Sequence, residues 1–148
     1  MTHIFIKTNV EYNEYFIHNH CYYLLKELKK YKDTYIDINI PKIISYHEEK
    51  KILTMQKVHG DNISNIYGEE FENVPNNIIN IIRQCLYLFD QYLIDYIDIT
   101  GYNFMLDKNK KLWIIDFQHA KYRNKFEKNN NFLSLFINGK NSWNPEFK

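Results

Sequence analysis

The stretch YIDITGYNFMLDKNKKLWIIDFQHA, residues 96–120, decides the fold of this chain. Its polar residues Asp98, Asn103 and Asp116 surround two apolar segments that are separated by a turn rich in Asp, Asn and Lys. The alternation of strand-forming and turn-forming residues over positions 102–115 predicts a β-hairpin. Because a hairpin returns the chain to its start, we expect the Asp116 carboxylate to lie close to Asn103.

These three side chains have the chemistry of a magnesium site. Mg²⁺ prefers hard oxygen donors and usually takes only one or two carboxylates, with phosphates and water completing its shell. Asn103 and Asp116 suit this role, which leaves Asp98 free to accept a proton or to orient a hydroxyl group. Taken one at a time, the same residues could equally be turn and cap residues, because Asp and Asn are common there.

The remaining elements follow from hydrophobic periodicity and from turn residues. The predicted order is a strand, a helix, a hairpin around the charged turn HEEKK, a break, and a long helix that leads into the 96–120 stretch. The last segment, residues 132–148, is expected to pack back on the domain, and docking to a partner is the alternative. The predicted bounds are His3–Lys7 (strand), Asn13–Tyr31 (helix), Lys42–Tyr46 and Ile52–Val58 (hairpin), Gly60–Asn62 (break), and Asn76–Tyr96 (helix).

Composition limits the class of protein. A chain of 148 residues with 45% hydrophobic content can bury one sizeable core, which predicts one domain over residues 1–148. The net charge of +1 comes from 19 basic and 18 acidic residues, which argues against a nucleic-acid-binding surface. Cys21 and Cys85 lie far apart without metal-ligand spacing, which favours reduced thiols and a cytoplasmic location.

Two further features of the composition concern membranes and origin. No apolar run approaches the ~20 residues that span a bilayer, so we expect no membrane contact. The many Asn, Ile, Lys and Tyr residues are typical of AT-rich genomes, which occur in some parasites, bacteria and large DNA viruses.

The 96–120 stretch resembles the catalytic loop of protein kinases. Tyr96, Asp98 and Asn103 occupy the family's His, Asp and Asn positions, and Asp116 opens DFQ where the family has DFG. The resemblance covers most of the chain from residue 3 to residue 120, and its style is closer to small atypical kinases and to relatives of aminoglycoside and choline kinases. It implies an α+β class and a truncated protein kinase-like fold, with a small antiparallel sheet plus a helical region.

The resemblance also implies two lobes and a set of roles. Residues 1–58 would be the remnant of the N-lobe, and residues 59–148 a reduced C-lobe. ATP and Mg²⁺ are the implied cofactors, with the metal on Asn103 and Asp116. Asp98 would act as a catalytic residue, and Lys7 in HIFIK matches the strand lysine that binds the phosphates and stabilises charge during transfer.

A hinge segment is implied by ILTMQKVHGDNI, residues 52–63. In similar proteins an apolar strand runs into such a hinge, and the backbone of the hinge binds adenine. The resemblance therefore assigns the carbonyl of Gln56 and the amide of Val58 to the adenine edge, with Met55 at the rear wall of the nucleotide pocket.

The partner of the strand lysine is the first departure from the family pattern. Kinases pair this lysine with a glutamate inside the following helix. Glu11 and Glu14 follow the strand too closely to lie well inside that helix, and the expected position falls near Asn19 or His20. Glu27 would serve only if the helix were shifted.

Other departures leave alternatives for the function. No glycine-rich loop precedes His3, and Gln118 replaces a glycine that can adopt backbone angles glutamine resists. The first hypothesis is a slow phosphotransferase whose acceptor is an unknown small molecule or protein, with a second copy of the chain able to supply missing surface. The alternative is a catalytically inactive kinase-like module for interaction or structure. A nucleic-acid binder is the third reading, and the near-neutral charge argues against it.

Overall fold

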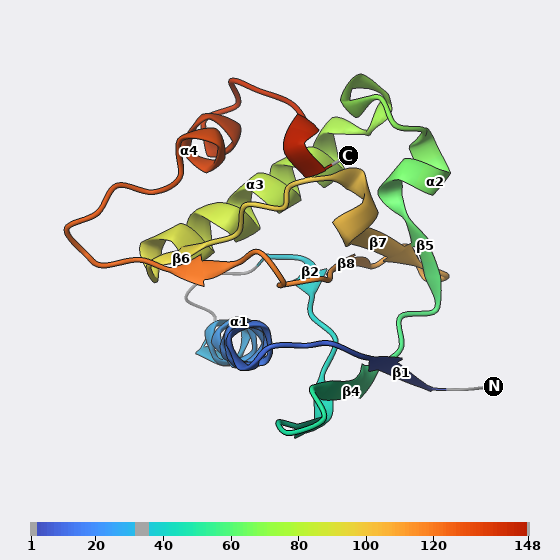
Figure 1. The fold of residues 1–148 in the computed structure, drawn as a ribbon. Helices are drawn as coiled ribbons and strands as arrows, with labels where there is room; N and C mark the ends of the chain where they lie inside the picture. The colour runs from blue at the N-terminus through green and yellow to red at the C-terminus, as the bar shows by residue number, and fades with distance from the viewer. Residues whose placement is uncertain (1–2, 32–35, 148) are drawn as a thin grey trace.

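The structure is a computed structural model that describes residues 3–31 and 36–147. Helices and short strands alternate along the chain, and Figure 1 shows their arrangement. The strands are β1 (Ile4–Lys7), β2 (Ile38–Asn39), β3 (Ile43–His47), β4 (Ile52–Gln56), β5 (Gly60–Asn62), β6 (Ile94–Asp95), β7 (Phe104–Asp107), β8 (Leu112–Ile114) and β9 (Lys121–Tyr122). The helices are α1 (Tyr12–Tyr31), α2 (Ile63–Tyr67), α3 (Asn76–Gln91) and α4 (Asn131–Ile137), with 3₁₀ turns at Phe71–Asn73, Gly101–Asn103 and Pro145–Phe147.

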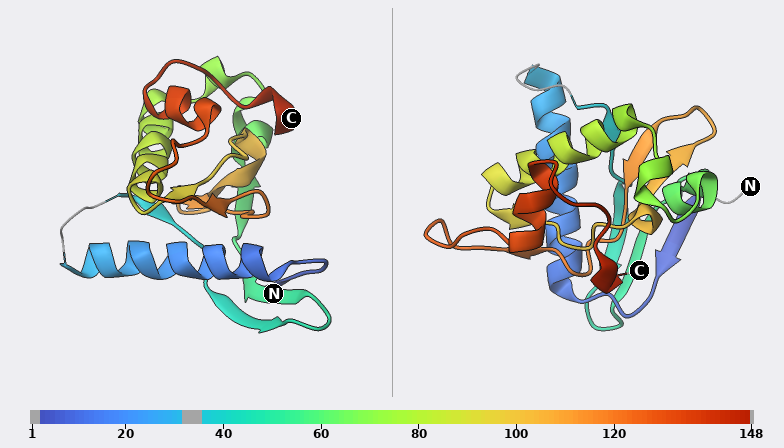
Figure 2. Two further views of the ribbon diagram at one scale, coloured as in Figure 1. Left: turned by 60° about the vertical axis from the view of Figure 1, so that its left-hand side comes forward. Right: turned by 90° about the horizontal axis from the view of Figure 1, so that it is seen from above.

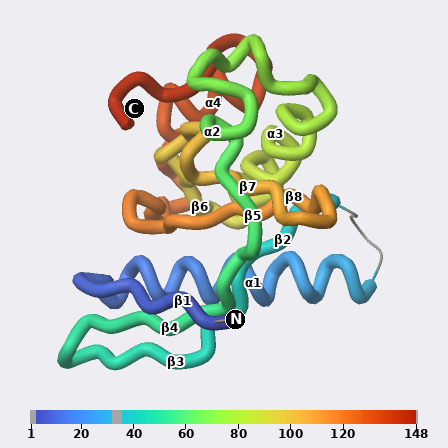
Figure 3. The backbone as a smooth tube through the Cα atoms, turned by 90° about the vertical axis from the view of Figure 1, so that its right-hand side faces the viewer, coloured from blue at the N-terminus to red at the C-terminus, as the bar shows by residue number. Residues whose placement is uncertain are grey.

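Two layers are visible in the backbone trace. The first contains α1 and the antiparallel sheet of order β1-β4-β3, and the second contains α2, α3 and α4 with β5 to β8 (Figure 3). In the left view of Figure 2, α1 runs as a long helix below the β7–β8 hairpin, while α3 stands beside the hairpin and α4 lies above it. The α+β class and the predicted order of strand, helix and hairpin are confirmed.

The first layer has a small apolar core of its own. Strand β4 alternates, so that Leu53 and Met55 point inward and are buried together with Val10. The aromatic rings of Tyr15 from α1 and Tyr46 from β3 stack at a centroid distance of 4.5 Å beside this core. This packing fixes the end of β1 and the start of α1 relative to β4, which is the strand that leads into the predicted hinge.

Helix α3 carries much of the larger core, but it is shorter than its periodicity predicts. Its buried side chains recur at helical spacing as expected. The prediction that the helix continues to Tyr96 is wrong, because α3 ends at Gln91 and Leu93 adopts a left-handed φ of 63°. The carbonyl of Leu93 then accepts a hydrogen bond from the amide of Arg123, so the chain leaves the helix to form β6 against β9.

The predicted hairpin is present as β7 and β8, with Phe104 opposite Ile114. Two further strands extend it to a four-stranded sheet of order β2-β8-β7-β5. Residues 60–62 were expected to break the preceding hairpin, and that hairpin does end at Gln56, but these residues then form β5 against β7 in the second sheet. Gly60 is required there, since a Cβ atom would lie 2.0 Å from the carbonyl oxygen of Leu106.

The C-terminal segment packs back on the second layer, as predicted. Helix α4 lies against α3, and Trp143 is only 3% exposed. The Trp143 ring contacts Phe71 edge-on and stacks near Phe104 and Phe136. Within residues 3–31 and 36–147, no helix has both the length and the apolar character needed to cross a membrane.

Candidate active site

A cavity of about 350 Å³ opens between the two layers. The cavity is lined by both layers. The first layer contributes residues of β1, α1 and the end of β4, and the second contributes residues of β7 and of the chain after β8; residues of the 57–60 segment, which connects the layers, also line it. It collects five of the seven residues that the sequence assigned to a site, namely Lys7, Met55, Gln56, Val58 and Asp116. The remaining lining residues are Phe5, Glu14, His18, Pro41, Lys57, Gly60, Met105 and Ile115.

Lys7 lines this cavity and is paired with two acidic side chains. Its Nζ atom donates to Glu14 Oε2 at 2.6 Å and to Asp116 Oδ1 at 3.2 Å. Burial by itself would lower the pKa of Lys7, but the hydrogen bond to Glu14 and the charge of Asp116 outweigh it, so that the pKa is raised. Lys7 is therefore a fixed positive charge at neutral pH, held between two acidic groups.

Glu14 is the helix glutamate that pairs with this lysine, and the expectation that it lies too early in the chain is wrong. The connection from β1 to α1 turns sharply at Asn9, whose φ is 58°, so the first turn of α1 folds back over Lys7. Glu14 is 5% exposed, and burial raises the pKa of its carboxyl although Lys7 opposes this shift. Neither Asn19 nor His20 takes this position.

His18 is a cavity residue that the sequence reasoning missed. It lies one helical turn after Glu14 on α1, so the two side chains share one face. Its Nε2 lies 2.7 Å from the carbonyl oxygen of Pro41, to which the neutral ring donates. Burial lowers the pKa of His18 to about 4, which keeps the ring uncharged at neutral pH. The spacing of four between Glu14 and His18 is the signal that could have identified both residues.

Asp116 holds the strained backbone that the sequence placed at Gln118. The φ of Asp116 is 61°, whereas Gln118 is not among the described residues with positive φ. The amide of Gln118 donates to Asp116 Oδ1 at 3.1 Å, which forms a local turn across the motif. Replacement of the motif's glycine by Gln118 therefore costs no backbone strain here.

Asp98 and Asn103 lie in the loop before the hairpin, outside the lining of the cavity. The Asn103 side-chain amide donates to the backbone carbonyl of Asp98 at 2.9 Å. The amide of Ile115 donates to the carbonyl of Asn103 at 2.9 Å, so the hairpin brings the residue before Asp116 back to Asn103 as predicted. Burial raises the pKa of Asp98, the neighbouring Asn103 opposes this, and the charge of Asp116 adds to it.

Tyr96 occupies the position of the kinase-loop histidine, and its contacts hold the loop in place. Its hydroxyl donates to the carbonyl of Ile115 at 2.6 Å, and its ring contacts Phe117 edge-on at a centroid distance of 5.4 Å. Tyr96 is 1% exposed. It therefore ties the loop that carries Asp98 to the strand end that carries Asp116.

Asn103 and Asp116 each keep a side-chain oxygen that could hold a magnesium ion. The Asn103 amide nitrogen is held by the Asp98 carbonyl, and the hydrogen bonds of the described residues reach only Oδ1 of Asp116. The side-chain oxygen of Asn103 and Oδ2 of Asp116 thus remain available as metal ligands. In the described part of the chain no three His, Cys, Asp or Glu side chains gather as a complete metal site. Two protein oxygens match the way Mg²⁺ is held when phosphates and water supply its other ligands.

Comparison with known proteins agrees with this geometry. No curated protein matches the sequence. Among solved structures, the kinase PK-1 of Cydia pomonella granulovirus is similar with a TM-score of 0.58 and 14% sequence identity. The match covers 80% of this chain and 43% of that chain, so the protein spans less than half the length of the viral kinase. Because the identity is low, this likeness establishes a kinase fold alone.

The sequence also matches the RIO domain family over residues 6–134. This match begins in β1 beside Lys7 and ends within α4, so it includes the cavity, the loop with Asp98 and the β7–β8 hairpin. The chain therefore belongs to the RIO domain family and is a kinase-like protein.

Proposed function

We propose that this protein is an ATP- and magnesium-dependent phosphotransferase. The contact that carries the proposal is the double pairing of Lys7 with Glu14 and Asp116 inside a cavity that the predicted hinge also lines. This arrangement holds a positive charge where phosphates would lie and keeps a carboxylate beside it for a metal ion. Phosphoryl transfer depends mainly on positioning and on electrostatic stabilisation, and these residues supply both.

The hinge residues support nucleotide binding at the other end of the cavity. Met55 is 7% exposed and lines the cavity together with Gln56 and Val58. Within the described residues, the amide of Val58 donates to no backbone or side-chain acceptor, so it is available to the edge of a base. We assign adenine to this end, with Met55 as the rear wall, and the phosphates to the end that holds Lys7.

The chemical step uses Asp98 as the group next to the acceptor. Asp98 accepts the proton of the acceptor hydroxyl as that oxygen bonds to the γ-phosphorus and the bond from this phosphorus to ADP breaks. The raised pKa of Asp98 suits a group that takes up a proton during the reaction. Bound magnesium supplies charge neutralisation at the phosphates, while Asn103 and Asp116 fix its position and Lys7 stabilises the same negative charge.

The alternative is a kinase-like module that binds nucleotide without transferring phosphate. Two departures from the kinase pattern suggest such an inactive module: the helix glutamate is not evident in the sequence, and Gln118 replaces a glycine. Glu14 fills the first role, and Gln118 does not adopt a positive φ. Both observations support the catalytic proposal over the inactive one.

Turnover of ATP separates the two proposals. The wild type should release ADP slowly in the presence of magnesium, with water or a hydroxyl of the chain itself as the acceptor. Asp98→Asn should lower this rate by about 100-fold while nucleotide binding persists, in the range of a lost general base. Glu49→Gln, in the exposed β3–β4 turn, is the matched control and should keep the wild-type rate.

The outcomes differ for each reading. Saturable binding of ATP without any turnover in the wild type would favour the inactive module. Equal turnover in the wild type and in Asp98→Asn would reject the role of Asp98. A ligand at a hundredfold its Kd adds about 2.7 kcal/mol to the free energy of unfolding. If millimolar ATP with magnesium does not stabilise the protein at all, both the phosphotransferase and the nucleotide-binding module are contradicted.

A further inference from the structure

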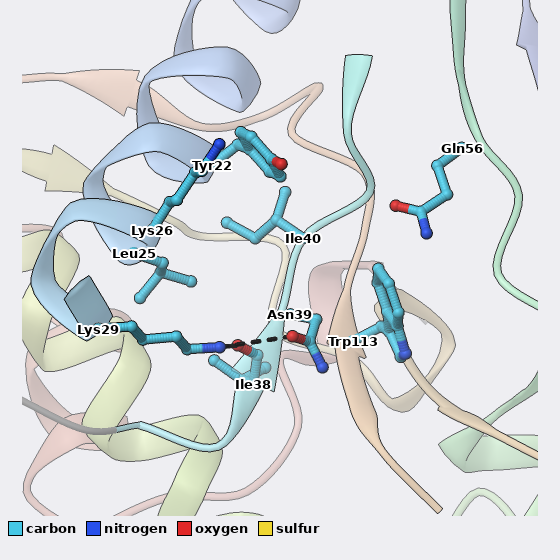
Figure 4. A pocket seen from close by; sticks show the side chains of 9 residues that line it. All are labelled: Tyr22, Leu25, Lys26, Lys29, Ile38, Asn39, Ile40, Gln56 and Trp113. Atoms are coloured by element: carbon cyan, nitrogen blue, oxygen red, sulfur yellow. Dashed lines mark hydrogen bonds between the residues drawn. The ribbon is translucent and has the colours of Figure 1, made fainter. Parts of the chain in front are cut away.

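A second cavity of about 270 Å³ lies behind the hinge, away from Lys7. Gln56 is the one residue that lines both cavities. In Figure 4 the side chains of α1 approach from one side, and Trp113 and Gln56 lie on the other, with the β2 segment between them. The lining residues are Tyr22, Leu25, Lys26, Lys29, Ile38, Asn39, Ile40, Gln56 and Trp113.

Lys29 gives this cavity a half-buried positive charge. Its Nζ donates to the carbonyl oxygen of Ile38 at 2.8 Å and to Asn39 Oδ1 at 3.4 Å, and both of these acceptors are neutral (Figure 4). Among the described residues, no carboxylate lies within 4 Å of this ammonium group. An ammonium group has three donors, so one N–H of Lys29 remains for a further acceptor.

The charges around Lys29 also favour an anion. Burial lowers the pKa of Lys29, the charge of Asp37 opposes this shift, and the charge of Lys111 adds to it. Lys26 is a second lining cation, and its Nζ lies 6.0 Å from the centre of the Tyr22 ring. Lys26 and Lys29 both line the cavity, and none of its described lining residues is an Asp or Glu, so an anionic ligand would meet complementary charge there.

The walls of the cavity select the shape of that ligand. Leu25, Ile38 and Ile40 are buried apolar residues, and the rings of Tyr22 and Trp113 supply flat surfaces. The volume lies just below the usual range for drug-sized ligands, which fits a molecule of one or two rings. Aromatic walls with a cation at one end match a flat apolar body that carries an anionic group.

We propose that this cavity is a second ligand site, which binds a small aromatic carboxylate through Lys29 and Trp113. The carboxylate accepts from the remaining N–H of Lys29, and the ring of the ligand lies against Trp113 and the apolar floor. Apart from Gln56, which lines both cavities, the lining residues of this site take no part in the nucleotide cavity.

The two tryptophans allow a direct test of binding. In ¹⁵N-labelled protein each indole N–H gives one NMR signal, and Trp143→Phe assigns them. The test titrates 2-naphthoate into the full chain, without nucleotide. The Trp113 signal should shift in a saturable way, and the Trp143 signal should stay fixed, because Trp143 packs among Phe71, Phe104 and Phe136.

Charge controls complete the experiment. Lys29→Met should weaken binding by about tenfold or more, the size of one charge-assisted hydrogen bond. Lys30→Met removes the same charge from an exposed neighbour outside the cavity and should leave the Kd unchanged. If Lys29→Met does not fold, the neutral analogue 2-naphthamide tests the same contact on the wild type and should bind about tenfold more weakly. An unshifted Trp113 signal, equal shifts of both indoles, or equal affinity for the carboxylate and the amide would overturn the proposal.

Discussion

The Nζ atom of Lys7 lies 2.6 Å from Oε2 of Glu14, and these residues are only seven positions apart in the chain. The pair is possible because the chain reverses at Asn9 between β1 and α1. Lys7 is 26% exposed and Glu14 5% exposed at the side chain, so solvent screens this ion pair only in part. The contact sets the orientation of Lys7 toward Asp116 across the cavity.

Glu14→Gln should impair the site more than it impairs the fold. The substitution keeps the size of the side chain but removes the charge that raises the pKa of Lys7 and fixes its ammonium group. We expect ATP turnover to fall by about tenfold or more, as for one charge-assisted hydrogen bond. Glu11→Gln removes a carboxylate from the same helix start, where Glu11 pairs with Lys51 on the surface, and should leave turnover unchanged. Equal losses in the two variants would contradict the role of Glu14.

Asp98→Asn should raise stability at neutral pH while it lowers activity. The folded-state pKa of Asp98 is raised, so the folded protein binds this proton more tightly than the unfolded chain does. The free energy of unfolding therefore falls as the pH rises from about 3.8 through the raised pKa, and Asn removes that loss. We expect Tm at pH 7.5 to rise by about 2 °C or more.

The pH dependence of this effect provides its control. The advantage of Asp98→Asn in Tm should shrink as the pH is lowered toward 3.8, where the wild-type carboxyl takes up its proton. Turnover by the wild type should increase as the pH rises through the same interval, because only the ionised carboxyl can accept a proton. A lower Tm for Asp98→Asn at pH 7.5 would show that Asp98 stabilises the fold instead of straining it.

Arg123 should be a main electrostatic support of the loop that carries Asp98. Its guanidinium group pairs with Asp90 at 2.7 Å and with Asp95, and it also donates to the carbonyl of Asp90. Asp95 is 1% exposed and accepts from the amide of Asn130 as well. Arg123→Met leaves the Asp95 charge buried without its partner and should cost about 3–5 kcal/mol in the free energy of unfolding.

A double-mutant cycle measured by urea denaturation isolates this interaction. Arg123→Met combined with Asp95→Asn should recover part of the lost stability, since the uncompensated charge is then absent. Strictly additive effects of the two substitutions would mean that the ion pair contributes nothing of its own.

The elements that can be predicted from the sequence are those whose signals are local. The strand with Lys7, the helix that follows it and the β7–β8 hairpin have regular apolar spacing or characteristic turn residues, and they form as predicted. Strand β5 has no such signal, because residues 60–62 become a strand only through their register with β7. The early end of α3 has no apolar signal either, because it follows from the left-handed φ of Leu93, whose amide donates to the carbonyl of Asp90.

The sequence predicts some residues of the candidate site and misses others. Lys7, Met55 and Asp116 could be assigned from short motifs, and the structure gathers them in one cavity. Glu14 could not be assigned from the sequence, because spacing along the chain does not show that the connection turns at Asn9. The backbone cost of Gln118 could not be judged from the sequence. A motif position does not reveal which residue adopts the positive φ, and in this motif it is Asp116.

Lys110 should test the backbone of the hairpin turn. Its φ is 61° and its side chain is exposed, so the residue bears the cost of a left-handed conformation without a compensating contact. Lys110→Gly should raise the free energy of unfolding by about 1 kcal/mol. Lys108→Gly, in the same turn but without positive φ, should lower it. Thermal unfolding of the two variants distinguishes these signs, and destabilisation by Lys110→Gly would contradict the described turn.

Calorimetric titration of ATP, with magnesium and again with EDTA, tests the proposed site most directly. In the wild type, removal of magnesium should weaken ATP binding by about tenfold or more, because the metal links the phosphates to Asn103 and Asp116. Asp116→Asn should bind ATP with nearly the same affinity in both buffers. If magnesium strengthens binding to Asp116→Asn as much as to the wild type, the metal is held elsewhere and the assignment of this site is wrong.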